Sequence, residues 1–569
     1  MWKYLKPHKW MLILGLVLVT ISSALNMVVP WLSGIIVDQV IVKGQTGKLI
    51  PYIIVMIVVT LVRSAIRYGF QIDFESISQR TIFKVRSEMY NKLQFLDVDY
   101  FDKNRTGDIM TKLTGDMDTL RHFIAWVIYM IYENSLIFIF GLGIMFYINY
   151  KFAFAVFLFT IPVAYFARKL TVEVKPTFKK IRAQFSRLNT VAEENISGNR
   201  VVKAFAKEDF EMEKFEKANA KFKQRNLESA AVWSKYLPTL EFLSGMLNIV
   251  TILVGGILVI KNMMSVGQLV TFNSLIFSVN NPLRMSGWLI NDCQRFTTSA
   301  EKILELLLVN PDIKNAPNAL DVEKLTGDIE FKDVNFSYDG EKILENINLK
   351  VKAGETIGIV GATGSGKTSI INLLCRFYDC SSGGIYIGGT NIKNINLQCL
   401  RRNIGAAMQD IFLFSDTIEG NIAYGVPETS IETVKDSAEK AQAADFIKDL
   451  EDAYDTIIGE RGVGLSGGQK QRISLARALI KDPSILILDD TTSAVDMETE
   501  HEIQTMLNKY KNNRTTFIIA HRISSVKKAN KIIVMDNGRI VEEGTHDELV
   551  ANKGYYYEVF KNQYGSEVI

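Results

Sequence analysis

The chain has 569 residues, of which 48% are hydrophobic and 22% are charged, and its mean hydropathy is +0.10. Soluble globular proteins are rarely this apolar, so the composition predicts segments that span a membrane. The formal net charge of +3 is too close to neutral to indicate a nucleic-acid partner, and we predict none.

Six apolar stretches in the first half of the chain are candidate membrane spans. The second is interrupted by Arg63 and Arg67, and the sixth contains Asn273, Asn280 and Arg284. Spans this polar must face other helices or a water-filled cavity rather than lipid. The candidates are residues 11–37, 51–70, 123–147, 152–166, 237–260 and 266–290.

Lysine and arginine are concentrated in two of the segments that connect these spans. The segments after the second and fourth spans are long and basic, whereas those after the first, third and fifth are short. The positive-inside rule therefore predicts a protein of the cytoplasmic membrane with both termini and both long segments in the cytoplasm. Because the long segments contain few glycines or prolines, we expect helices that extend beyond the bilayer.

The N-terminal sequence shows no evidence of a cleavable signal. The apolar run that begins at Trp10 continues past Leu32 without an A-x-A site. A run of this length suits a spanning helix better than the core of a signal peptide.

The pattern changes near residue 310. Residues 309–326 are predicted to be a linker between a transmembrane domain, residues 1–308, and a second domain, residues 327–569. From residue 327 short apolar strands alternate with helices, which is typical of an α/β domain, and residues 533–542 resemble a hairpin that turns at 536–538. The four cysteines contain no CxxC pair, so we expect reduced, inert thiols.

Residues 361–368 read GATGSGKT, which is the phosphate-loop pattern GxxxxGK[ST]. The pattern follows an apolar strand, 356–360, and precedes a predicted helix, which is the context that a phosphate site needs. Backbone N–H groups, the helix N-terminus and a lysine would all face phosphate oxygens. A glycine-rich turn without a ligand is the alternative. The predicted nucleotide ligands here are Gly361, Thr363, Gly364, Ser365, Gly366, Lys367, Thr368 and Ser369.

Four further residues are predicted to share this site. Asp489 ends the buried strand 484–488 and could hold Mg²⁺ with Thr368, although it could also be a helix cap. His521 ends another strand and could contact the γ-phosphate, although a lone histidine is usually a surface or core residue. Gln409 could orient Mg²⁺ or water. Tyr338 could stack on adenine, although an isolated aromatic is more often packing.

Residues 465–469 read LSGGQ. Here the chain resembles the ATP-binding-cassette (ABC) family, whose signature this is, and the order and spacing of the other motifs match. The resemblance implies a six-helix α transmembrane bundle followed by an α/β P-loop nucleotide-binding domain, with ATP and Mg²⁺ as cofactors. It also implies that two such domains dimerise head to tail, so that each ATP contacts the partner's signature. The signature ligands would be Ser466, Gly467, Gly468 and Gln469.

Two cytoplasmic segments resemble the coupling segments of ABC exporters, residues 100–108 and 195–205. Six spans fused upstream of one cassette is the arrangement of an exporter half-transporter, since importers usually keep permease and ATPase on separate chains. The likeness covers essentially the full length, so we expect no additional N-terminal peptidase domain.

The chain departs from the family at the residue after Asp489. The family usually has a glutamate there, which acts as general base, and this chain has Asp490. An aspartate carboxylate falls back by about 1–1.5 Å, and a misplacement of that size can cost ~100-fold in rate. We therefore predict that Lys367, Asp489 and Asp490 form a site that binds ATP but hydrolyses it slowly, with Asp490, His521 and Gln409 as its catalytic residues. Bacterial exporters that this chain resembles and that have aspartate here are typically one half of a heterodimer with one slow site, so the resemblance implies a heterodimer. A homodimer with slow turnover is the alternative.

The predicted function is ATP-driven export of hydrophobic or amphipathic compounds by alternating access. Multidrug export is what the resemblance implies by default, and lipids and peptides are also compatible. An ATP-gated channel or regulator and an importer on the same fold are the rival functions, whereas the spans exclude a soluble cassette protein. Polar residues at membrane depth could line the cavity or join helices: Glu133, Asn248, Asn273, Asn280 and Arg284.

Overall fold

The computed structural model describes residues 2–509 and 514–564, and the chain divides into two compact units. Unit 1 comprises Met1–Gln94 and Arg105–Val309, and unit 2 comprises Phe95–Asn104 and Asn310–Ile569. Unit 1 ends one residue after the predicted transmembrane domain. The short segment Phe95–Asn104 differs from the predicted division, because its contacts group it with unit 2.

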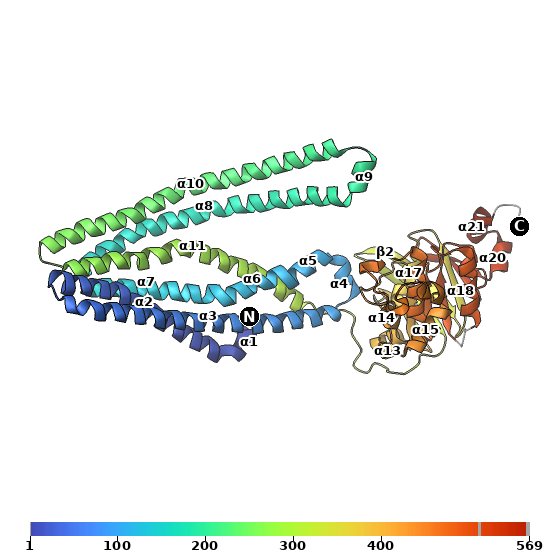
Figure 1. Ribbon diagram of the computed structural model, residues 1–569. Coiled ribbons are helices and arrows are strands. Elements are labelled where there is room, and N and C mark those ends of the chain that lie inside the picture. The colour runs from blue at the N-terminus through green and yellow to red at the C-terminus, as the bar shows by residue number, and fades with distance from the viewer. Residues whose placement is uncertain (1, 510–513, 565–569) are drawn as a thin grey trace. The chain divides into compact units, whose positions relative to one another are not determined.

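Unit 1 consists of long helices, and α8 and α10 form a hairpin closed by the short α9 (Figure 1). Helix α3 has 46 residues. At 1.5 Å per residue such a helix is about 69 Å long, more than twice the ~30 Å hydrocarbon core of a bilayer. The long basic segments are therefore helical extensions of the spans. The bounds are α1 Trp2–Leu5, η1 Lys6–His8, α2 Lys9–Ile36, η2 Val37–Val42, η3 Thr46–Lys48, α3 Leu49–Gln94, α5 Thr106–Thr111, η4 Lys112–Asp116, α6 Met117–His122, η5 Phe123–Val127, α7 Ile128–Ile148, α8 Tyr150–Ser197, α9 Asn199–Ala204, α10 Glu208–Ile260 and α11 Val266–Leu308.

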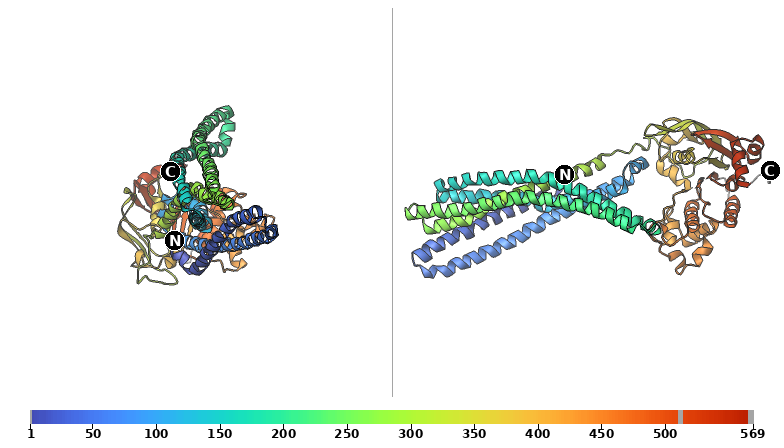
Figure 2. Two further views of the ribbon diagram at one scale, coloured as in Figure 1. Left: turned by 90° about the vertical axis from the view of Figure 1, so that its left-hand side faces the viewer. Right: turned by 90° about the horizontal axis from the view of Figure 1, so that it is seen from above.

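Among the described residues, five helical segments are long and apolar enough to cross a membrane. They carry the first five predicted spans. The sixth predicted span lies in α11, which is a continuous helix of 43 residues but is more polar, because it contains asparagines and Arg284. The two views of Figure 2 show these helices of unit 1 as one bundle.

The start of α11 is held by the segment that follows α2. The carboxylate of Asp38 accepts hydrogen bonds from the hydroxyl of Ser265 at 2.5 Å and from the backbone N–H of Gly267 at 2.7 Å. Ser265 and Gln268 also form a capping box at this helix start. Three backbone N–H groups at this helix start, those of Ser265, Gly267 and Gln268, thus have side-chain partners.

Several of the polar residues predicted at membrane depth are buried within unit 1. The exposed fractions of Glu133 and Asn280 are both 8%. The side-chain oxygens of Asn248 and Asn273 are buried and have no hydrogen-bond partner among the described residues. Arg284 is exposed. Whether any of them lines a substrate cavity stays a prediction.

Unit 2 contains two sheets. The larger has the strand order β10-β9-β3-β8-β7-β6, in which the five strands from β9 to β6 are parallel and β10 pairs antiparallel with β9. The smaller is antiparallel with the order β2-β1-β4-β5. The hairpin predicted around residues 536–538 is confirmed as β9–β10. The strands are β1 Ile329–Tyr338, β2 Glu341–Val351, β3 Thr356–Gly361, β4 Ser382–Ile387, β5 Thr390–Asn391, β6 Ile404–Ala407, β7 Ile485–Asp489, β8 Thr515–Ile519, β9 Lys531–Asp536 and β10 Arg539–Gly544.

Helices pack on both faces of the parallel sheet. In β7, Ile485 and Ile487 belong to the hydrophobic core that includes α12, whereas Leu486 and Leu488 belong to the core that includes α17. This is the period of two that a strand buried on both faces requires. The helices are α4 Val98–Lys103, α12 Lys367–Leu374, η6 Ile392–Asn394, α13 Leu397–Arg402, α14 Ile418–Ala423, α15 Ile431–Lys440, α16 Ala444–Lys448, η7 Ala453–Asp455, η8 Glu460–Gly462, α17 Gly467–Leu479, α18 Met497–Lys509, α19 Ile523–Val526, α20 His546–Asn552 and α21 Tyr555–Tyr564.

All four cysteines are free thiols. Cys375 is buried in the core of unit 2, and burial raises its pKa to about 12. A thiol with so high a pKa carries almost no thiolate near neutral pH, in agreement with the predicted inert role.

Candidate nucleotide-binding site

Four adjacent strands of the parallel sheet end at the same edge of unit 2. The register pairs Ile359 of β3 with Ile519 of β8, Ile519 with Asp489 of β7, and Leu488 of β7 with Ala407 of β6. The segments that leave these strands are therefore neighbours at the carboxyl edge, where α/β sheets bind ligands. They carry the phosphate loop, His521, Asp489 with Asp490, and Gln409, so the topology brings these predicted residues to one edge.

The phosphate loop wraps around the amine of Lys367. The Nζ atom donates hydrogen bonds to the carbonyl of Gly361 at 2.9 Å and to the carbonyl of Ala362 at 2.7 Å. Gly366 precedes α12 with φ of 98°, and a Cβ atom there would lie only 2.6 Å from Leu344 Cδ2. The loop therefore needs glycine at this position for both its backbone angle and its space.

Two features of this loop fit a phosphate ligand. The hydroxyl of Ser365 is buried and has no hydrogen-bond partner among the described residues, so it is free to donate to a ligand. Burial lowers the pKa of Lys367, and the carboxylates of Asp489 and Asp490 oppose that shift. Anionic phosphate oxygens would likewise favour the charged amine.

Asp489 and Thr368, two of the three predicted Mg²⁺ ligands, are in direct contact. The Thr368 hydroxyl donates a hydrogen bond of 3.2 Å to Asp489 Oδ2. Burial raises the pKa of Asp489, and the hydrogen bond from Thr368 opposes this shift. Among the described residues, no group of three or more His, Cys, Asp or Glu side chains could hold a metal ion. Two hard oxygen donors fit Mg²⁺, which keeps several waters and takes few protein ligands.

Asp490 begins the turn after β7. Its backbone has φ of 49°, and its N–H donates to the carbonyl of Ile519 at 2.9 Å. Aspartate is among the non-glycine residues that adopt this left-handed conformation most readily. The side chain is half-buried, and its charge acts on both Lys367 and Asp489. The carboxylate predicted to be the weak general base therefore lies in the phosphate-loop environment.

The remaining predicted residues differ in how they are held. Gln409 and His521 are exposed, and the carbonyl of His521 accepts a hydrogen bond of 2.7 Å from the Gln563 side chain. Tyr338 is half-buried at the end of β1, where its ring packs edge-on against Phe336 and Tyr378. The ring of Tyr338 thus has packing contacts, which were the alternative to stacking on adenine.

The signature residues lie at the N-terminus of α17. Ser466 caps α17, and it forms a reciprocal capping box with Gln469, with distances of 2.8 and 3.3 Å. Ser466 and Gly467 are exposed. Within the part of the chain that the structure describes, no hydrogen bond or ion pair joins residues 466–469 to residues 361–369.

Comparison with known proteins identifies the family. The model of the ABC transporter transmembrane region matches residues 12–283, and the ABC transporter model matches residues 344–493. The "Uncharacterized ABC transporter ATP-binding protein YknU" of Bacillus subtilis (strain 168) is 40% identical over 566 residues, which cover 99% of this chain and 96% of that protein. The chain belongs to the ABC transporter family.

Other relatives place it among half-transporters of the ABC exporter type. The "ATP-dependent lipid A-core flippase" of Syntrophus aciditrophicus (strain SB) is 34% identical over 100% of this chain and 94% of the flippase. The "Putative multidrug export ATP-binding/permease protein YgaD" of Bacillus subtilis (strain 168) is 33% identical over 99% of this chain and 98% of that protein. A solved "bacterial Atm1-family ABC exporter with ATP bound" superposes with a TM-score of 0.84 at 26% identity, covering 98% and 99% of the two chains.

Sequence reasoning missed two residues that organise the site of this ABC exporter half-transporter. Gln471 of α17 donates to the carbonyl of Asp490 at 3.2 Å and to the Ser493 hydroxyl at 3.0 Å, and it accepts from the N–H of Ala494 at 3.1 Å. Glu500, 3% exposed, accepts from Ser525 and pairs with Arg522, next to His521. Neither contact has a local sequence signal.

We predict that Gln471→Ala loosens the turn that holds Asp490. The change removes three hydrogen bonds, each with a net worth of about 0.5–1.5 kcal/mol. Purified full-length protein should unfold at a temperature several degrees lower and hydrolyse ATP more slowly. Gln504→Ala, on the nearby α18 but with bonds of only 3.4 Å, is the matched control. An unchanged unfolding temperature for Gln471→Ala would contradict the prediction.

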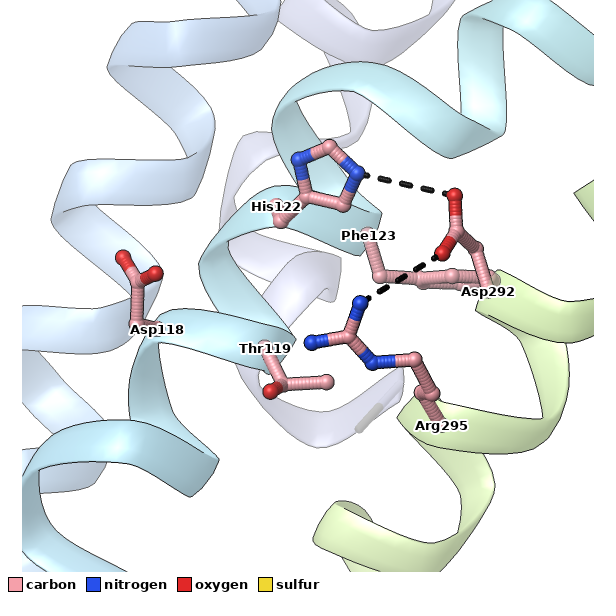
Figure 3. Close-up of a pocket in the computed structure, with 6 residues that line it drawn as sticks. All are labelled: Asp118, Thr119, His122, Phe123, Asp292 and Arg295. Atoms are coloured by element: carbon pink, nitrogen blue, oxygen red, sulfur yellow. Dashed lines mark ion pairs between the residues drawn. The ribbon is translucent and has the colours of Figure 1, made fainter. Parts of the chain in front are cut away.

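A small hollow lies in unit 1, between α6 and α11 (Figure 3). His122 Nε2 lies 3.6 Å from Asp292 Oδ2, and Arg295 lies 3.9 Å from the other oxygen of the same carboxylate. The imidazole and the guanidinium thus both face the Asp292 carboxylate. None of the five residues predicted to line a substrate cavity borders it.

Proposed function

We propose that this chain is one half of a heterodimeric ABC exporter that uses ATP to move hydrophobic or amphipathic compounds out across the cytoplasmic membrane. Its own nucleotide site is the slow one of the pair. The proposal of slow hydrolysis rests on Asp490, whose carboxylate is shorter than that of glutamate and lies next to Asp489 and the phosphate loop.

The phosphate loop supplies the binding half of the reaction. Lys367, the N–H groups at the start of α12 and the Ser365 hydroxyl hold the triphosphate, while Thr368 and Asp489 hold Mg²⁺. The metal, when bound, neutralises charge on the phosphates. Asp490 accepts the proton of the attacking water, Gln409 orients that water, and His521 contacts the γ-phosphate. The short reach of Asp490 makes proton transfer the weak step.

The other half of each site comes from a second half-transporter. The exposed N-terminus of α17 at Ser466 offers N–H groups and a positive dipole end to a phosphate, and among the described residues no hydrogen bond joins it to the phosphate loop. The tip formed by α9 and its flanks also exposes apolar side chains: Ile196 at 76%, Val201 at 61% and Phe205 at 71%. Such a tip, the second predicted coupling segment, suits docking on a partner chain.

Apolar surface in unit 1 supports the substrate class. Ala24 and Met27 of α2 face Ile139 and Phe140 of α7 around an apolar hollow. Methionine and phenylalanine adapt to apolar ligands of varied shape. The names of the relatives, a lipid A-core flippase and a putative multidrug exporter, favour an amphipathic compound, and multidrug export is the broader form of the proposal.

The test is ATP hydrolysis by the purified full-length chain in lipid nanodiscs. Alone, the chain is expected to turn over slowly, and Asp490→Glu should raise the rate by about 10- to 100-fold because the longer carboxylate reaches the water. Asp490→Asn, which has no base, is the control. Vigorous turnover by the unaltered chain alone would contradict the slow site and favour an active homodimer.

Glutamate at a left-handed backbone position can cost up to about 1–2 kcal/mol, so thermal unfolding of Asp490→Glu must accompany the assay. Uphill accumulation of a fluorescent amphiphile in inside-out vesicles tests transport. ATP-dependent flux that never exceeds equilibrium would instead indicate a gated channel, and accumulation in right-side-out vesicles would indicate an importer.

A further inference from the structure

The short helix α4, which overlaps the first predicted coupling segment, is bonded to the rest of unit 2 at both ends. At its start, the carboxylate of Asp97 accepts hydrogen bonds from the N–H groups of Asp312 at 2.5 Å and Ile313 at 3.3 Å. At its end, Asp102 accepts a hydrogen bond from the hydroxyl of Tyr378. Phe95–Asn104 therefore groups with unit 2 because specific polar contacts hold it there.

The end of α4 also contacts the turn that follows Tyr338. Lys103 forms an ion pair of 3.0 Å with Asp339, the residue directly after Tyr338. Both side chains are largely exposed, so this pair is the weaker of the two links. The bond from Tyr378 to the Asp102 carboxylate is charge-assisted and less exposed, which makes it the stronger link.

Tyr378 in turn fixes the ring of Tyr338. The two ring centroids lie 5.0 Å apart at an interplanar angle of 88°, and Phe336 packs against both rings at 4.6 and 5.6 Å. Edge-to-face pairs of this kind favour one relative orientation. Burial, followed by the hydrogen bond to Asp102, raises the pKa of Tyr378, so its hydroxyl stays a donor at any physiological pH.

We propose that Tyr378 is a positioning residue for nucleobase recognition, and that it links the adenine-facing Tyr338 to the coupling helix α4 through Asp102. This inference rests on the proposed function, in which Tyr338 is the base contact. Because coupling between two sites is reciprocal, a base held by Tyr338 stabilises the docked α4, and a docked α4 tightens base binding. We call Tyr338, Tyr378 and Asp102 the relay. The relay responds to the base of the nucleotide, whereas the phosphate loop binds its phosphates.

The experiment compares Mg·ATP with Mg·tripolyphosphate, a ligand without a base, on the full-length protein in nanodiscs. Tyr378→Phe keeps the ring and removes the link to Asp102, and it is expected to weaken ATP binding about 3- to 10-fold while leaving tripolyphosphate binding unchanged. Asp102→Ala should have the same effect, and the double variant should be no weaker than either single one. Asp102→Asn, which can still accept the bond, should stay near the unaltered protein.

Tyr454→Phe is the matched control, because that buried hydroxyl has no hydrogen-bond partner among the described residues. The relay is overturned if Tyr378→Phe weakens both ligands equally or neither. Tyr338→Ala separates this outcome from a failure of the proposed function. If it weakens ATP alone while Tyr378→Phe does not, only the relay fails. If Tyr338→Ala does not weaken ATP binding more than tripolyphosphate binding, Tyr338 is not a base contact, and that part of the proposed function fails.

Discussion

Ser466→Arg is expected to abolish ATP hydrolysis by the assembled transporter, whereas Asp490→Asn is expected to leave most of it. In the proposed heterodimer the signature of this chain completes the competent site of the partner, so a bulky cation at the α17 N-terminus blocks that site. Asp490 serves only the slow site. We expect a loss of more than about 100-fold for Ser466→Arg and less than about 3-fold for Asp490→Asn in the co-purified dimer.

The control for Ser466→Arg is Ser430→Arg. Ser430 is also an exposed serine that caps a helix of unit 2, α15, and its loss costs about 0.5–2 kcal/mol of stability. It carries no predicted ligand, so turnover should be retained. If Asp490→Asn abolishes turnover as completely as Ser466→Arg, both sites depend on Asp490 and the dimer is a homodimer.

Lys367→Met is expected to remove most nucleotide binding by this chain. Lys367 is 6% exposed, and the hydrogen bonds of its amine place a full positive charge within the phosphate loop. Methionine keeps the apolar stem and loses the charge. A charge-assisted bond to phosphate is worth about 1.5–3 kcal/mol, so the dissociation constant for ATP should rise by at least about 10- to 100-fold.

The readout is thermal stabilisation by ATP. Ligand at 100 times its dissociation constant stabilises a protein by about 2.7 kcal/mol, and this increment should largely disappear in Lys367→Met. Lys448→Met, an exposed lysine on α16, is the control and should keep the full increment. Retention of the increment by Lys367→Met would show that the loop does not bind the phosphates.

The order of chemistry along the chain can be predicted from sequence because each motif is local. Gly361 to Thr368, the strand that ends at Asp489 and the hairpin after Ile533 each depend on neighbours within a few residues. The strand-helix alternation then implies a parallel sheet, and a parallel sheet brings strand ends to one edge. The first five spans follow equally directly from hydropathy. The sixth, in α11, is too polar to be recognised by hydropathy alone, and its long continuous helix is evident only in the structure.

Contacts between distant segments were decided by the tertiary structure alone. Asp102 and Tyr378 are separated by 276 residues, and Asp38 and Ser265 by 227, so no periodicity or motif connects them. Gln471 lies next to a recognised signature, yet its role depends on the turn of Asp490 folding against α17. Sequence patterns thus determined the family and the first five spans, and they predicted the chemistry of the phosphate loop. Packing decided which side chains hold Asp490, Tyr338 and the coupling helix in place, because long-range neighbours are chosen by the fold and leave no local trace.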